Sequence, residues 1–298
     1  MGQGESQDYE LKAGDAIARF SCMGAECRVW TVGGRRMTWG GDASVWSGVA
    51  PVLFPVCGWS RDGKISVGDT IYPMPVHGFA AQSVFSASQT SEDELRFTLV
   101  ADDVTRGHYP FDFKLDVVYR LSESTLDVAL HVENIGTGAM PYACGMHPGF
   151  TWEGGPSQVV FQALECAHVP LIAPGGLFSA DTRPVPLRGR RLALSSDLFA
   201  AEALCFLDVA SRRLSFDCPD GRLDVHAPDF PHLVLWSRDA APFLAIESWT
   251  GTGDLDGFEG DFFERPSMIH LQPGARGVHR VSYAWHPSAP LAEAPNSA

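Results

Sequence analysis

The sequence lacks any cysteine spacing typical of a zinc knuckle or a dithiol redox centre. Its seven cysteines are an odd number at irregular spacings, and no C-x-x-C occurs. Several stand in apolar runs such as ALCFLDV (203–209), where a buried thiol behaves as a small hydrophobic side chain. We therefore expect reduced, structural cysteines and a cytoplasmic location, because disulfides are rare in the cytosol.

Long hydrophobic runs and positive charge are also scarce. No apolar stretch approaches the roughly 20 residues that span a bilayer, and the polar, acidic start MGQGESQDYELKAGD does not resemble a secretory signal. Lys and Arg number 22 against 36 Asp and Glu, which gives a net charge of −14. Since an acidic chain repels phosphate backbones and anionic lipid, we expect neither nucleic acid nor a membrane as a partner.

Helical periodicity is nearly absent, whereas alternation with a period of two is frequent. Residues 113–136 predict a hairpin that turns at 122–124, residues 212–228 a hairpin around Pro-Asp-Gly, and residues 232–249 a strand pair broken at 238–242. Further strands are expected in 25–34, 94–102, 157–165 and 277–286, and helical turns only in 194–204.

Strands without crossover helices, thirty glycines and twenty-one prolines favour an all-β protein, a large antiparallel β-sandwich. No linker divides the sequence, so we expect one domain over residues 1–298. Its core should run from about 15 to 287, between frayed termini. No repeat of 20 to 50 residues indicates a propeller.

Three familiar motifs are missing or incomplete. No G-x-S-x-G elbow occurs, so a hydrolase of that type is not indicated. GWSRDGK (58–64) matches the start of a phosphate-binding loop, but Ile65 follows where Ser or Thr is needed, and a β-turn is the better interpretation. The acidic loop 250–261 could offer calcium Asp254, Asp256 and Glu259. It lacks EF-hand spacing and is expected to be a solvated or sugar-side loop without metal.

Three ionisable residues stand in surroundings that call for explanation. His77 in MPVHGF and His147 in PYACGMHPGF lie in stiff, apolar, Pro- and Gly-rich turns. Glu247 emerges in the apolar strand PFLAIESW beside Trp249. Each has an ordinary alternative, since a histidine can be a hydrogen-bonded core residue and a glutamate can face solvent. Together they predict a site, because one carboxylate and one imidazole form a minimal general base and general acid.

The chain resembles the aldose 1-epimerase (galactose mutarotase-like) family, and within it the broad bacterial branch of mutarotase homologues. The similarity follows family order over residues 15–287. It is carried by PVLFPVCG (51–58), PMPVHGFA (73–80), YPFDFKLDVVYRL (109–121), VENIGTGAMPYACGMHPGF (132–150), DLF (197–199), FLAIESWTG (243–251) and IHLQPGA (269–275).

This resemblance implies a β-supersandwich with a sugar-binding cleft and an isomerase that interconverts the α and β anomers of a free aldose. His147 matches the general acid of the family and Glu247 its general base, while His77 matches a histidine that hydrogen-bonds the substrate. Trp249 and Phe79 are the aromatic candidates for contact with the sugar. The resemblance implies a monosaccharide as the partner. It implies neither a metal nor an organic cofactor.

The sequence departs from the family pattern at two positions where relatives carry arginine, namely Trp59 and Ala81. Arg61 is a candidate substitute in sugar binding. These losses favour an unphosphorylated sugar over a hexose 6-phosphate, and leave open a carbohydrate-binding protein without activity on the same scaffold. A His/His/Glu zinc enzyme is a further alternative, although zinc sites often take two ligands from one short segment. The sugar, the oligomeric state and the pathway are not specified by the sequence.

Overall fold

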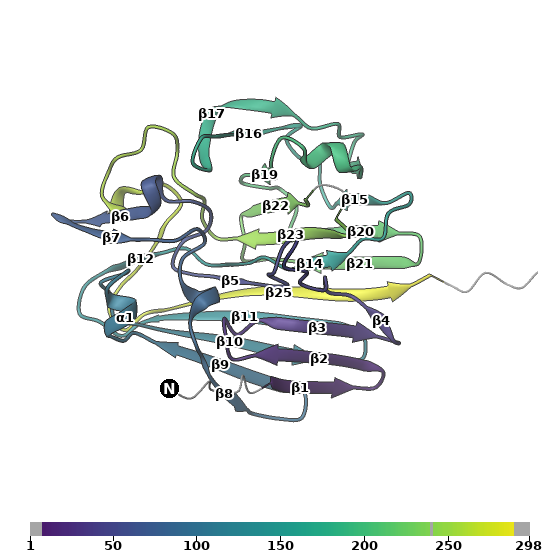
Figure 1. The fold of residues 1–298 in the computed structure, drawn as a ribbon, viewed down its shortest axis with the longest axis horizontal. Helices are drawn as coiled ribbons and strands as arrows, with labels where there is room; N and C mark the ends of the chain where they lie inside the picture. Colours follow the sequence, from purple (N-terminus) through teal and green to yellow (C-terminus); the bar gives the residue numbers. More distant parts are fainter. Residues whose placement is uncertain (1–7, 239–240, 289–298) are drawn as a thin grey trace, which may run out of the picture.

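The alternating segments of the sequence fold as strands, and every hydrogen-bonded pair of strands is antiparallel (Figure 1). The computed structural model describes residues 8–238 and 241–288. Its strands form one nine-stranded sheet, one six-stranded sheet, one four-stranded sheet and three two-stranded ribbons. The predicted all-β class is therefore confirmed.

The largest sheet carries the hairpins that the sequence predicted. In spatial order it contains β18 (Arg191–Ala193), β15 (Gln158–Phe161), β20 (Arg213–Cys218), β21 (Gly221–His226), β25 (Arg276–Pro287), β11 (Thr125–Asn134), β10 (Phe113–Leu121), β9 (Glu94–Val100) and β8 (Ser86–Gln89). The strands β10 and β11 pair from Phe113 opposite Asn134 to Leu121 opposite Leu126, as expected for a turn at 122–124.

The six-stranded sheet carries the second predicted strand pair, β22 and β23. Its order is β19 (Leu204–Phe206), β22 (His232–Trp236), β23 (Phe243–Trp249), β13 (Gly145–Met146) and β5 (Val52–Leu53), with β14 (Gly149–Thr151) also paired to β23. All seven residues of β23 are buried, which means that this strand is covered on both faces.

The remaining strands flank these two sheets. The four-stranded sheet is β1 (Asp8–Ala13), β2 (Ala16–Ser21), β3 (Cys27–Val32) and β4 (Arg35–Arg36). The ribbons are β6 (Lys64–Val67) with β7 (Thr70–Pro73), β12 (Met140–Tyr142) with β24 (Ile269–Leu271), and β16 (His168–Ala173) with β17 (Leu177–Pro184). Because 64–73 is a hairpin, the phosphate-loop-like motif before it leads into no helix.

One continuous apolar core joins the three large sheets. Phe20 of β2 packs on Tyr119 of β10 with ring centroids 4.6 Å apart, and Leu244 and Ile246 of β23 belong to the same buried cluster. The alternate residues Phe243, Ala245 and Trp249 of β23 belong instead to smaller clusters on the opposite face of the sheet. That opposite face forms the floor of the candidate site.

Two sequence expectations need correction. The core begins earlier than residue 15, because β1 pairs with β2 from Asp8 onward. Helical turns are also not confined to 194–204, where a single 3-10 turn, η3 (Ser196–Phe199), forms. A short helix, α1 (Asp103–Arg106), follows Asp102, whose side chain caps it by accepting from the Thr105 N–H.

The other short turns are η1 (Arg61–Gly63), η2 (Ala80–Gln82) and η4 (Phe262–Glu264). Among the residues that the structure describes, no helix has the length and apolar character that crossing a bilayer requires. Both predicted frayed ends fall partly outside the described residues, at 1–7 and 289–298.

Candidate active site

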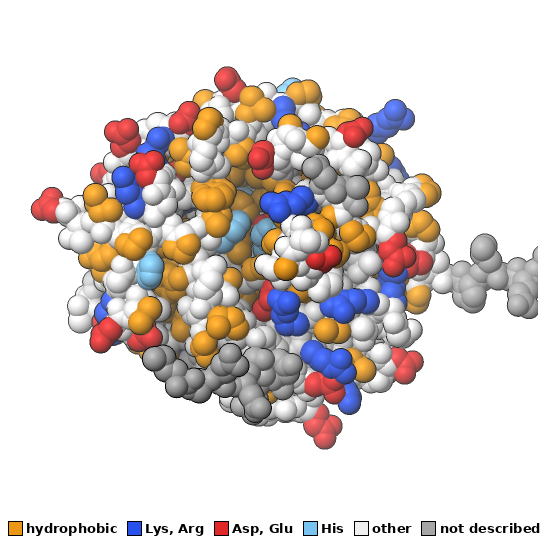
Figure 2. Space-filling model, viewed as in Figure 1, with side chains coloured by type: hydrophobic (Ala, Val, Ile, Leu, Met, Phe, Trp, Pro, Cys, Tyr) orange, Lys and Arg blue, Asp and Glu red, His pale blue; other side chains and the backbone are white. Residues whose placement is uncertain are grey.

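His77, His147 and Glu247 meet at the floor of one cleft, although they come from three distant parts of the chain. Their nearest potential ligand atoms all lie within 4.8 Å of one another. The cleft has a volume of about 400 Å³ and opens on the outer face of the six-stranded sheet. Figure 2 shows it as a hollow with histidine side chains visible inside and hydrophobic side chains around the rim.

Glu247 is held by the register of β23. It stands opposite Val234 of β22, and its side chain is 2 % exposed. Its Oε2 accepts a hydrogen bond of 3.0 Å from the indole N–H of Trp249. Trp249 is the next residue on the same face of the strand. Burial raises the pKa of the Glu247 carboxyl well above its usual value, and the Trp249 hydrogen bond opposes that shift.

His147 lies on the short link between β13 and β14, where prolines and glycines prevent any continuous strand. Its backbone N–H donates to the Pro51 carbonyl at 3.0 Å. Its Nε2 lies 3.3 Å from Oε1 of Glu247, while its Nδ1 has no hydrogen-bond partner among the described residues. Burial lowers the pKa of His147 well below its usual value, and the nearby His77 lowers it further.

His77 is fixed by a tight turn with unusual backbone geometry. Its φ is +63°, and the next residue, Gly78, has φ +77° and lies so close to Phe54 that an added Cβ would meet the Phe54 carbonyl oxygen at 2.0 Å. A glycine is therefore required there. The ring of His77 stands edge-on to His147, with centroids 5.4 Å apart.

The hydrogen bond from the Gly58 N–H to Nδ1 of His77, 3.1 Å long, defines the protonation state of that ring. Because Nδ1 accepts, the proton of the neutral imidazole is on Nε2, which becomes a donor toward the cleft. Burial lowers the pKa of His77 to about 4, so the ring is neutral near pH 7. The turn thus presents a fixed hydrogen-bond donor rather than a cation.

The same three side chains have the composition of a metal site, since two imidazoles and a carboxylate are suitable zinc ligands. A histidine that binds a metal through Nε2 carries its proton on Nδ1 and donates it to an acceptor. In His77 this atom faces the Gly58 N–H, another donor, and in His147 it faces no partner. The donor set therefore suits proton transfer better than metal binding.

Of the three predicted sugar-contact residues, only Trp249 lines the cleft. Phe79 is 6 % exposed and packs in the main core against Phe54 and Phe113, so it supports the turn of His77 from behind. The place of Phe79 two residues after His77 does not reveal which side of such a turn faces the core.

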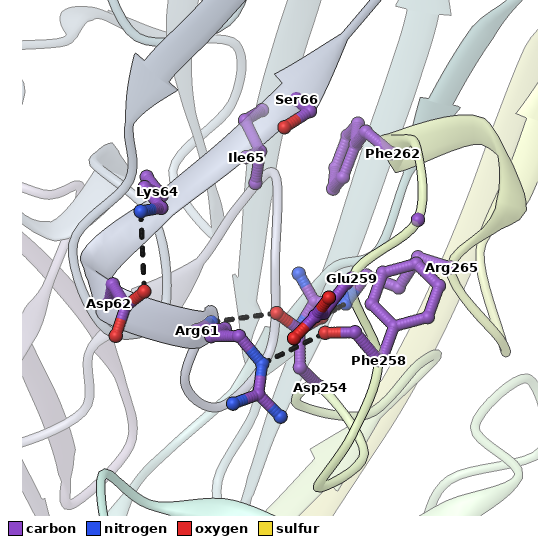
Figure 3. A pocket seen from close by; sticks show the side chains of 11 residues that line it. Arg61, Asp62, Lys64, Ile65, Ser66, Asp254, Phe258, Glu259, Phe262 and Arg265 are labelled. Atoms are coloured by element: carbon purple, nitrogen blue, oxygen red, sulfur yellow. Dashed lines mark hydrogen bonds and ion pairs between the residues drawn. The ribbon is translucent and has the colours of Figure 1, made fainter.

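Arg61 points into a neighbouring pocket of about 290 Å³ instead (Figure 3). Its Nε donates to the Phe258 carbonyl at 2.9 Å, and its guanidinium lies 3.4 Å from Asp256. It therefore does not replace, in the cleft, the arginines that relatives carry.

The acidic loop 250–261 is solvated only in part, since Asp256 and Glu259 are exposed but Asp254 is not. Asp254 is buried, forms an ion pair with the buried Arg265 at 2.9 Å, and accepts from the Arg61 backbone N–H at 2.7 Å. Its backbone pairs with Trp59 and Phe178, two side chains that line the cleft. Asp254 and Asp256 of this loop contact arginines, and the loop supports the cleft wall.

Sequence reasoning missed several residues of the cleft. Trp46 and Trp236 flank His147, Cys205 lies on its floor, and the exposed Gln82 and Glu202 lie at its edge. Trp236 could have been found, because the register of the β22–β23 hairpin places it on the face that carries Glu247. Trp46 stands in an irregular loop whose sequence carries no periodic signal.

Comparison with known proteins decides the family. The model of the aldose 1-epimerase family matches residues 7–179, more than half of the chain. The chain belongs to the aldose 1-epimerase family. The matched stretch of the chain contains His77 and His147 but not Glu247. The place of Glu247 in the site is therefore supported by the geometry of the cleft.

Several known proteins are similar to this chain over most of their length. Protein LacX of Lactococcus lactis subsp. lactis is 29 % identical over 284 residues, which cover 89 % of this chain and 94 % of LacX. A galactose mutarotase-like protein from Lactobacillus casei is 27 % identical with a TM-score of 0.88, covering 94 % of this chain and all of that one. A galactose mutarotase related enzyme from Lactobacillus acidophilus is 25 % identical with a TM-score of 0.86, over 94 % and 97 % of the chains.

Proposed function

We propose that the protein is an aldose 1-epimerase that interconverts the α and β anomers of a free aldose. The observation that carries this proposal is the 3.3 Å approach of His147 Nε2 to Glu247 Oε1 at the floor of a cleft, in a chain of this family. A general acid and a general base in contact with one bound sugar are what ring opening and closure require.

The pair can share a proton that moves between its two members. Burial raises the pKa of the Glu247 carboxyl and lowers that of the His147 imidazole, which favours the neutral carboxyl beside the neutral imidazole. Transfer of that proton from the carboxyl to Nε2 gives a carboxylate and an imidazolium without any change in total charge. The carboxylate is then the base and the imidazolium the acid.

In the proposed reaction, Glu247 takes the proton of the anomeric hydroxyl while His147 protonates the ring oxygen. The bond between the anomeric carbon and the ring oxygen breaks with its electron pair on the oxygen, and the open-chain aldehyde forms. Rotation about the bond between carbons 1 and 2 exposes the other face of the aldehyde, and closure reverses both proton transfers. The Nε2–H of His77 is available to bind a sugar oxygen during these steps. No step needs a metal or an organic cofactor.

The charge of the cleft favours an unphosphorylated sugar. Within the described residues no lysine or arginine lines it, whereas two carboxyl groups, Glu202 and Glu247, do. A phosphate group would meet no cationic side chain among those that line the cleft and would lie close to carboxyl groups, which is unfavourable in a site of low dielectric. A hexose 6-phosphate is therefore expected to be a poor substrate.

The test is anomer exchange measured by polarimetry on freshly dissolved α-D-glucose, α-D-galactose and other aldoses. The parent protein should accelerate exchange of at least one aldose, and Glu247→Gln and His147→Asn should each lower the rate by roughly 10²-fold or more. Glu92→Gln, a change at an exposed residue outside the cleft, serves as the matched control and should keep full activity. Sugar binding without accelerated exchange in the parent would instead identify a carbohydrate-binding protein.

A further inference from the structure

We propose that the cleft is built for a 6-deoxyaldohexose, whose methyl group at carbon 6 lies against Trp46 and Trp236. This inference rests on the proposed function, because that function defines which sugar atoms meet His147 and Glu247. It goes further by naming the class of sugar.

The surroundings of the proton donor are aromatic. The ring of Trp46 lies over His147 with centroids 4.9 Å apart and planes inclined by 32°. Trp236 meets the same imidazole edge-on at 5.5 Å and Trp46 at 5.4 Å. All three side chains line the cleft, so this aromatic corner is part of the surface that a bound sugar touches.

The register of the sheet tells which end of the sugar reaches this corner. Val234 stands opposite Glu247, and Trp236 stands opposite Ala245, two residues before Glu247 on β23. Because residues two apart on a strand share a face, the cleft floor runs from Trp249 past Glu247 toward the Trp236 corner. A sugar with its anomeric hydroxyl at Glu247 and its ring oxygen at His147 extends carbon 5 in that direction. Carbon 6 is bonded to carbon 5 and therefore lies near Trp46 and Trp236.

Among the described side chains that line the cleft, neither Trp46 nor Trp236 offers an acceptor to which a hydroxymethyl group can donate its proton. An indole has a single N–H donor and no acceptor. In the described part of the cleft, the polar side chains other than His77, His147 and Glu247 are Gln82 and Glu202, and both are exposed. A hydroxyl group held in the corner would lose hydrogen bonds to water that the corner does not fully replace. A methyl group would instead gain apolar contacts with the indole rings.

The expected consequence is a preference for the deoxy sugar on the order of 10-fold in kcat/KM, the range by which apolar pockets discriminate single groups. Two matched series test it: D-glucose, 6-deoxy-D-glucose and D-xylose, and D-galactose, 6-deoxy-D-galactose and L-arabinose. Each series carries hydroxymethyl, methyl or hydrogen at the same position. The methyl sugar should be fastest in at least one series, since the pentose loses the apolar contact. Equal or faster exchange of the hexose in both series would overturn the inference.

The same sugars are also compared by calorimetric binding, which separates this inference from the proposed function. Exchange of no sugar above buffer would defeat the proposed function. The binding order of methyl, hydroxymethyl and hydrogen would still decide the inference, and tighter binding of the hexose than of its 6-deoxy analogue would overturn it.

Variants of Trp236 locate the source of the preference. Trp236→Gln introduces a hydrogen-bond acceptor. It should lower the ratio of kcat/KM for the deoxy sugar to kcat/KM for the hexose by at least about 3-fold. Trp236→Phe keeps an apolar ring and should retain the ratio. A structural role alone would change the rates of all sugars together, so a fall in rate with an unchanged ratio in Trp236→Gln would contradict the proposed contact.

Discussion

Trp249 donates its indole N–H to Oε2 of Glu247, while the other carboxyl oxygen faces Nε2 of His147. The carboxyl group is therefore bound on both sides within a buried sheet. A hydrogen bond to a carboxylate stabilises the ionised form, so Trp249 opposes the effect of burial on the Glu247 pKa. Trp249, which was predicted to contact the sugar, therefore also influences the pKa of the proposed base, Glu247.

We predict that Trp249→Phe raises the pKa of the Glu247 carboxyl further and slows anomer exchange at neutral pH by roughly 10-fold, the scale of a hydrogen bond to a charged group. The reactive form, a carboxylate beside an imidazolium, carries as many protons as the neutral pair, so raising the pH should not restore the rate. The alkaline limb of the pH profile of kcat/KM, where the pair loses that proton, should instead move to higher pH in the variant. A loss of rate with an unchanged alkaline limb would show that Trp249 acts through packing alone.

We predict that Glu247→Gln is as stable as the parent or more stable, with a difference that grows as the pH rises. The folded-state pKa of Glu247 lies above the unfolded value, so below the unfolded pKa the buried carboxyl is protonated without penalty. Above it, the unfolded chain ionises more readily, and the parent loses stability up to the folded-state pKa. The glutamine variant has no such loss.

Urea unfolding of both proteins at about pH 5, 7 and 9 measures this difference. Glu92→Gln again controls for the chemistry of the substitution at an exposed position. A stability difference that shrinks with rising pH would contradict the shift assigned to Glu247.

The buried pair of Asp254 and Arg265 supports the wall of the cleft. Arg265 also donates to the carbonyls of Trp59 and Thr252, and burial lowers the pKa of its guanidinium while Asp254 opposes that shift. We predict that Arg265→Met lowers the free energy of unfolding by about 3–5 kcal/mol, since it leaves a buried carboxylate without its partner.

Arg280→Met removes an exposed arginine paired with Asp229 and should change the free energy of unfolding by about 1 kcal/mol or less. Denaturant unfolding of the two variants is the measurement. Equal decreases in the free energy of unfolding for Arg265→Met and Arg280→Met would show that the Asp254–Arg265 pair does not stabilise the cleft wall.

The fold could be predicted from the sequence where the pattern was local. The alternation of Leu115, Val117 and Tyr119 defines a strand face, and all three are buried. The helix at 103–106 was missed because it depends on one capping side chain rather than on periodicity. The early start of β1 was missed because its pairing with β2 is a tertiary contact.

The site could be predicted in part for a similar reason. His77, His147 and Glu247 were identified because each contrasts with its neighbours, and the structure brings their side chains together. Arg61 and Phe79 were chosen from their place in the sequence, which does not determine whether a side chain faces the cleft, the core or another pocket. Four of the seven cysteines, Cys27, Cys57, Cys144 and Cys205, are buried, as the apolar runs around several of them suggested.

The central claim is that His147 and Glu247 act as one unit in exchanging the anomers of a free aldose. The most direct test is the anomer exchange rate, by exchange NMR, of the parent, His147→Asn, Glu247→Gln and the double variant. Residues that act together are strongly non-additive, so each single variant should lose nearly all the acceleration and the double variant should be hardly slower. Independent losses that multiply in the double variant, or a parent rate equal to that of buffer, would contradict the account.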